Sequence, residues 1–298
     1  LYPPAFFIVA KPNAFLYNRS KPEKGENNMK YKHHEESLKK LIEYFTTASE
    51  NKDHIIAIVF GGSVAKGLER PDSDLDCMIV LTDERYNKLV KENRTCECIS
   101  GYCTYEGGYF DTKYYNKQFL IDVAEKGSEP ARNAFLKSRC IYTIDDEIPG
   151  LVERIPVFQK QEKEDKMLSF YSALCMNTGY FWDMSRQPEE IFLRTKTVAE
   201  IVMYGLRLLL EEKEVLFPCP KSLYTAVGRL EDKPEGILEK ADFLLRNIYS
   251  EDAKNDFENT LLDFLDYEPP ADSANTFTRY VEDNELWWRN PRPLVGEW

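Results

Sequence analysis

A glycine pair and a serine, followed by two aspartates on an apolar strand, constrain this chain more than any other feature. The run Ile55–Phe60 is short, apolar and rich in branched side chains, which predicts a buried strand. Gly61 and Gly62 then allow a sharp turn and a close approach of the backbone to a ligand. Ser63 is a good N-cap, so a helix is expected to start at Val64. A helix start with free N–H groups suits a phosphate.

The same segment continues through a turn into a second strand. The turn ends at Ser73, and Leu75–Leu81 is apolar enough to predict another buried strand. Asp74 and Asp76 lie two residues apart, so their carboxylates leave the same face of that strand. Adjacent acids repel each other unless a cation lies between them, and Mg²⁺, with its oxygen ligands and substrate phosphates, is the natural cation.

This arrangement resembles the DNA polymerase beta-like nucleotidyltransferase superfamily. The signature of that superfamily is a Gly-Gly/Ser turn, a short spacer and an Asp-x-Asp pair on a strand. The residues that match it are Gly61, Gly62, Ser63, Asp74 and Asp76. The resemblance implies a phosphate loop, a site for two Mg²⁺ ions and a third carboxylate on a neighbouring strand.

Asp111 is the candidate for the third carboxylate. The aromatic stretch Gly108–Tyr115 is expected to be a strand, and alternation places Tyr109, Asp111 and Lys113 on one face. Asp111 would complete the metal site and could also accept the proton of an acceptor hydroxyl. The alternative is Asp122, but its stretch is expected to be helical, which would point it away from the sheet.

The order of expected elements predicts an α+β protein with two domains after an N-terminal extension at residues 1–28. Residues 29–150 alternate helix and strand, which predicts a nucleotidyltransferase head with a small mixed sheet flanked by helices. The expected strands are 55–60, 75–81, 97–105, 108–115 and 140–144, and the expected helical segments are 34–48, 83–93 and 116–126. Residues 151–298 are expected to form an all-α bundle, with its later helices at 221–230, 234–249, 252–266 and 277–288.

A catalytic head followed by a helical bundle resembles the bacterial antibiotic and small-molecule nucleotidyltransferases, such as those for kanamycin, streptomycin and lincosamides. In those families the bundle often lends a basic residue to the triphosphate. The candidates for nucleotide contacts here are Lys196 near one helix start, Lys221 and Tyr224 at another, and Lys113 beside Asp111.

Composition narrows the expected substrate and compartment. The net charge of −12, without a basic block, argues against a nucleic-acid partner, since such a partner requires a basic face. No stretch approaches the length of a membrane helix, so a membrane partner is not expected either. The seven cysteines are scattered and odd in number, which suggests reduced thiols in a cytoplasm. A zinc site at Cys96, Cys98 and Cys103 would lack an evident fourth ligand.

The expected function is therefore that of a cytoplasmic, Mg²⁺-dependent enzyme. It would transfer NMP from an NTP, with ATP as the expected donor, to a small-molecule acceptor and release pyrophosphate. The alternative is a non-catalytic nucleotide sensor, or a toxin-type nucleotidyltransferase that acts on a protein or RNA partner.

Overall fold

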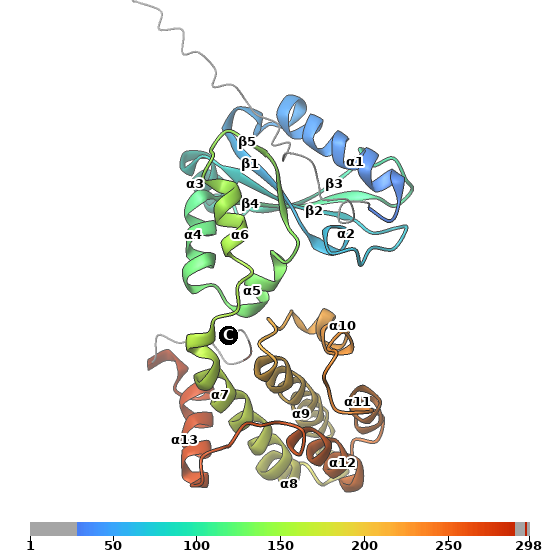
Figure 1. Ribbon diagram of the computed structural model, residues 1–298, viewed down its shortest axis with the longest axis vertical. Helices are drawn as coiled ribbons and strands as arrows, with labels where there is room; N and C mark the ends of the chain where they lie inside the picture. The colour runs from blue at the N-terminus through green and yellow to red at the C-terminus, as the bar shows by residue number, and fades with distance from the viewer. Residues whose placement is uncertain (1–28, 290–295, 297–298) are drawn as a thin grey trace, which may run out of the picture. The chain divides into compact units, whose positions relative to one another are not determined.

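The computed structural model describes residues 29–289 and residue 296, and the chain divides into two compact units (Figure 1). The first unit runs to Gly127 and continues from Ala134 to Pro156. The second unit contains Ser128–Asn133 and the chain from Val157 onward. A mixed sheet with flanking helices in the first unit and a helical second unit confirm the predicted α+β fold class. The predicted extension at 1–28 lies outside the described residues.

The first unit is built on a five-stranded sheet with the strand order β3-β4-β2-β1-β5. The strands are β1 (Ile55–Phe60), β2 (Leu75–Leu81), β3 (Cys96–Ser100), β4 (Tyr109–Asn116) and β5 (Arg139–Thr143). Strands β2 and β4 run parallel, and the other neighbours run antiparallel. The expected strand 97–105 is too long, because β3 ends at Ser100 and a loop follows.

Helices cover both faces of this sheet, and Figure 1 shows α1 on one face and α4 on the other. The helices of the first unit are α1 (Lys32–Glu43), which continues through a π-turn at Tyr44–Ala48, α2 (Gly62–Ala65), α3 (Asp83–Lys91), α4 (Lys117–Lys126) and α6 (Ile148–Arg154). Leu41 and Phe45 pack with inward residues of the sheet such as Phe110 and Tyr114. Helix α6 was not expected, because Pro149 and Gly150 suggest a break; the proline fits at the first turn.

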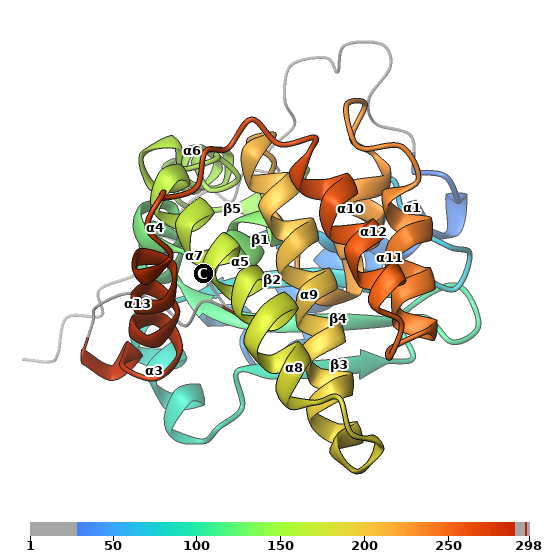
Figure 2. The same cartoon turned by 90° about the horizontal axis from the view of Figure 1, so that it is seen from below.

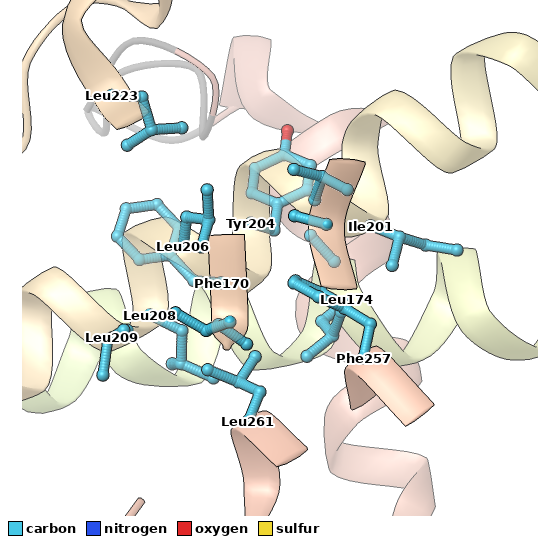
Figure 3. Close-up of a cluster of buried hydrophobic side chains, with 14 of the residues drawn as sticks. Phe170, Leu174, Ile201, Tyr204, Leu206, Leu208, Leu209, Leu223, Phe257 and Leu261 are labelled. Carbon is cyan, nitrogen blue, oxygen red and sulfur yellow. The ribbon is translucent and has the colours of Figure 1, made fainter. Parts of the chain in front are cut away.

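The second unit is organised around the long helices α7 (Lys163–Met176) and α9 (Ile191–Glu212), which lie side by side (Figure 2). Around them lie α5 (Glu129–Ala134, most of which belongs to this unit), α8 (Trp182–Met184), α10 (Leu223–Gly228), α11 (Ile237–Arg246), α12 (Glu251–Leu262) and α13 (Ser273–Asn284). Figure 3 shows the core, where Phe170 and Leu174 of α7 lie near Tyr204 of α9 and near Phe257 and Leu261 of α12.

Buried charged side chains hold the segment 128–133 to this unit. Glu129 is fully buried, and its two oxygens accept hydrogen bonds from Lys166 Nζ at 2.9 Å and from the Phe217 N–H at 2.9 Å. Glu211 is also fully buried, and its carboxyl lies beside that of Glu129. Burial, together with the nearby charge of Glu129, raises the pKa of Glu211 well above its ordinary value.

We expect Glu211→Gln to stabilise the protein at neutral and alkaline pH. A carboxyl with a raised folded-state pKa contributes stability that is present below its unfolded pKa and lost as the pH rises toward the folded value. The wild type loses about 1.4 kcal/mol of stability for each unit by which the pKa of Glu211 in the folded state exceeds that in the unfolded state. Glutamine cannot ionise, so the variant does not lose this stability. Its melting temperature should match the wild type near pH 4 and exceed it by several degrees at pH 8.

The exposed Glu239→Gln is the matched control, because it removes a carboxylate from the same unit without touching a buried group. Its melting curve should follow that of the wild type at both pH values. A Glu211→Gln variant whose advantage does not grow with pH would contradict the assignment of a neutral, buried Glu211.

Candidate active site

The glycine turn after β1 carries the most constrained backbone of the first unit. Gly62 has φ +71°, and a Cβ built on it would lie 1.7 Å from Asp76 Oδ2, so the carboxylate of Asp76 occupies the space that a side chain would need. Helix α2 has only one turn, with Gly61 as its N-cap. Ser63 therefore lies inside the helix rather than at its N-cap. The prediction of a Ser63 cap is wrong, because Gly62 itself already belongs to the helix.

Three carboxylates converge beside this turn. Strands β2 and β4 pair in parallel with Asp76 opposite Asp111, so both side chains leave the same face of the sheet. Asp74 lies one residue before β2. One oxygen atom from each of Asp74, Asp76 and Asp111 lies within 4.8 Å of the others, and all three residues are half-buried. The structure thus brings together the three acids that the sequence singles out.

Alternation along β4 separates the acidic face from the core. Phe110, Thr112 and Tyr114 are buried, and Phe110 and Tyr114 join the cluster beneath α1. Asp111 and Lys113 point to the opposite face and remain partly exposed. Lys113 Nζ lies 2.9 Å from Asp111 Oδ2 and 3.9 Å from Asp76 Oδ1.

The electrostatics of this face favour a bound cation. Burial raises the pKa of Asp76, and the charges of Asp74 and Asp111 raise it further, while Lys113 and the Ser63 N–H act in the opposite direction. The pKa of Lys113 lies above its ordinary value, because Asp111 and Asp76 outweigh the effect of its burial. The negative charge is thus only partly compensated by the protein. A hard divalent cation with oxygen ligands fits this donor set.

Two tyrosines that border the site hold the start of β2. The Tyr105 hydroxyl donates a hydrogen bond of 2.5 Å to the carbonyl of Ser73, the residue before Asp74. A hydrogen bond to Asp74 raises the pKa of Tyr109 to about 12. The sequence predicts Tyr109 on the Asp111 face, but it places Tyr105 at the end of the expected strand 97–105 and indicates no role for it. The only local signal is that Tyr105 precedes a glycine pair, which is typical of a loop.

We expect Tyr105→Phe to lower turnover about tenfold. Without the hydrogen bond to its carbonyl, Ser73 no longer fixes the backbone before Asp74, and the Asp74 carboxylate loses its defined position. The lost hydrogen bond should reduce stability by only about 1 kcal/mol, since the ring is kept. Initial rates of pyrophosphate release and melting temperature measure the two effects. Tyr102→Phe, on the same loop and more exposed, is the control and should leave both unchanged. Equal rates in the two variants would contradict this role of Tyr105.

The other predicted nucleotide contacts lie in the second unit. Lys196 is on α9 and pairs with Glu200 at 2.6 Å. Lys221 lies exposed on the 3₁₀ turn Pro220–Ser222. Tyr224, on α10, has a pKa raised to about 12 by burial and by Asp242. Their contact with nucleotide stays a prediction.

The alternatives for metal ligands do not assemble. Asp122 lies on α4, as expected, and pairs with Lys126 at 3.2 Å. Within the described residues, the only group of three or more His, Cys, Asp or Glu that could hold a metal ion is the acidic triad, so Cys96, Cys98 and Cys103 form no such group. In the same part of the chain, no helix is both long and apolar enough to cross a bilayer.

One stretch of the chain, which holds most of the sheet, matches a known family of domains. Residues 38–130 match the family model for a nucleotidyltransferase domain. That range contains the glycine turn, the acidic triad and Lys113, so the predicted resemblance and the predicted class of enzyme are confirmed at the level of this domain. No curated protein matches the chain.

Two solved structures resemble the chain at low identity. A nucleotidyltransferase-like protein from Exiguobacterium sibiricum is 11% identical, with a TM-score of 0.42, over 87% of this chain and 81% of that one. A spectinomycin adenyltransferase from Enterococcus faecialis, solved with ATP and spectinomycin, is 14% identical, with a TM-score of 0.31, over 83% of this chain and 96% of that one. The functional assignment rests on the domain match and the site geometry instead.

Proposed function

We propose that this protein transfers the nucleotidyl group of ATP to a small-molecule acceptor and releases pyrophosphate. The observation that carries the proposal is the convergence of Asp74, Asp76 and Asp111 within 4.8 Å, inside the range that matches a nucleotidyltransferase domain. Such a domain implies an NTP substrate. The net charge of −12, without a basic block, disfavours a nucleic-acid acceptor, which motivates the choice of a small molecule.

Each residue of the site has a role in this reaction. Asp74, Asp76 and Asp111 would hold Mg²⁺, with two ions in the complex with nucleotide; when bound, the metal neutralises charge on the phosphates. The turn at Gly61, Gly62 and Ser63 would approach the β and γ phosphates. The proximity of the three carboxylates to one another and to the glycine turn supports these roles.

The transfer itself requires one proton acceptor and in-line positioning. An acceptor hydroxyl oxygen forms a bond to the α-phosphorus while the bond from that phosphorus to the bridging oxygen breaks and pyrophosphate leaves. Asp111 is placed at the open face of β4 and would take the proton of the hydroxyl. Catalysis would rest on the fixed orientation of these groups and on neutralisation of the phosphate charge.

A pyrophosphate-release assay with ATP, Mg²⁺ and a panel of aminocyclitol, aminoglycoside and other polyhydroxylated acceptors tests the proposal. We expect release that depends on one class of acceptor, and an acceptor product heavier by one AMP in mass spectrometry. Binding of Mg²⁺-ATP without release for any small acceptor would favour the sensor or toxin-type alternative. Absence of Mg²⁺-ATP binding would refute the nucleotidyltransferase.

A further inference from the structure

Lys113 places its ammonium beside two carboxylates of the acidic triad, at the face where a metal ion would bind. Its Nζ contacts Asp111 Oδ2 at 2.9 Å and lies 3.9 Å from Asp76 Oδ1. No other lysine, arginine or histidine of the described chain forms an ion pair with Asp74, Asp76 or Asp111 in the structure. Among the described residues, a single ammonium thus lies against two of the three carboxylates, those of Asp111 and Asp76.

The register of the sheet places these three side chains within reach of one another. Lys113 follows Asp111 by two residues on β4, so alternation places both on one face, and the parallel pairing sets Asp76 directly opposite Asp111. The three side chains are each about one-third exposed, with 37% for Lys113, so they are only partly screened by water. Attraction between these opposite charges holds the ammonium against the acids.

We propose that Lys113 takes the place of a divalent ion in the nucleotide-free protein, so that metal binds tightly only together with nucleotide. This inference rests on the proposed function, because it assigns the triad to metal binding. The ammonium and a metal ion would compete for the same carboxylate oxygens of Asp111 and Asp76. Metal that arrives alone must therefore displace Lys113 and leave that charge without a partner.

Bound nucleotide removes the cost of leaving the displaced Lys113 ammonium without a partner. The lysine side chain has a flexible four-carbon stem, and phosphate oxygens offer the displaced ammonium a new partner on the same open face. Metal and nucleotide then favour each other's binding, and the coupling is reciprocal. The role differs from a fixed phosphate contact, since Lys113 acts first on the carboxylates.

Binding of Mn²⁺ without nucleotide, followed by electron paramagnetic resonance, tests the proposal on the full chain. We expect Lys113→Met to bind Mn²⁺ about tenfold more tightly than the wild type. A non-hydrolysable ATP analogue should tighten Mn²⁺ binding strongly in the wild type and much less in the variant. Lys126→Met, which removes a lysine that pairs with Asp122 outside the triad, is the matched control and should behave as the wild type does.

Melting in EDTA gives a second readout that needs no metal. Lys113→Met should melt below the wild type, because the triad is left without its cation, and the double variant Lys113→Met/Asp111→Asn should recover most of the loss. If Lys113→Met does not yield folded protein, Lys113→Gln serves in its place with the same expectations. Unchanged or weaker Mn²⁺ binding in the variant, or no Mn²⁺ binding by either protein, would overturn the proposal.

These readouts separate the inference from the proposed function. None of them uses turnover, so a protein that shows the expected Mn²⁺ behaviour but releases no pyrophosphate would keep the role of Lys113 and lose the transfer reaction. Normal transfer combined with equal Mn²⁺ binding in wild type and variant would support the transfer reaction and refute the role of Lys113.

Discussion

Replacing Asp76 by asparagine is expected to reduce nucleotidyl transfer by about a thousandfold or more, since a site that relies on charge neutralisation loses a metal ligand. Asp76 is the best-placed member of the triad to show this effect. It lies opposite Asp111 in the register of β2 and β4, and its carboxylate fills the space above Gly62. The asparagine amide has nearly the same shape, so the turn should keep its conformation. Initial rates of pyrophosphate release measure the loss.

The same variant should become more stable when metal is absent. The pKa of Asp76 is raised in the folded protein, so its contribution to stability is present at low pH and is lost as the pH rises through the folded value. Asparagine stays neutral and avoids that loss, so the variant should melt above the wild type in EDTA at pH 8, with no such advantage near pH 4.

Asp122→Asn is the control for both effects, because Asp122 is the rival acid and lies on α4 outside the triad. Its turnover should equal that of the wild type. Near-normal turnover in Asp76→Asn, or a large loss in Asp122→Asn, would show that the triad is not the metal site.

Gly62→Ala is expected to lower turnover by about a hundredfold or more, since a displacement of catalytic groups by about 1 Å has effects of that size. An alanine Cβ at this position would lie 1.7 Å from Asp76 Oδ2, so the carboxylate must move. A non-glycine residue at φ +71° is also strained, at about 1–2 kcal/mol. The variant should therefore lose both stability and turnover.

Gly67→Ala separates the effect of backbone strain from the effect of displacing Asp76. Gly67 has φ +68°, close to that of Gly62, but nothing lies within 4 Å of a Cβ built on it. It should lose a similar amount of stability and keep its turnover. Melting temperature and pyrophosphate release are measured for both variants. A parallel loss of turnover in the two alanine variants would mean that strain, rather than the position of Asp76, controls the site.

Local patterns in the sequence were enough to predict the parts of this site. The branched apolar runs predicted β1 and β2 with their observed bounds, because strands buried on both faces consist of short apolar runs. Alternation placed Asp111 and Lys113 on one face of β4. The helical pattern around Asp122 excluded this residue as the third carboxylate of the site. These inferences depend only on backbone periodicity, which is a local property.

Long-range contacts decided the rest. Only the parallel pairing of β2 with β4 sets Asp76 opposite Asp111, and only the packing of the turn shows that Asp76 fills the space at Gly62. Tyr105 reaches Ser73 across 32 positions of the chain, so no local pattern could reveal that contact. Likewise, segment 128–133 joins the second unit through the buried charge of Glu129. Residue type and spacing thus determined which groups the site contains, whereas strand order and packing determined their distances, because those distances come from segments that meet only after folding.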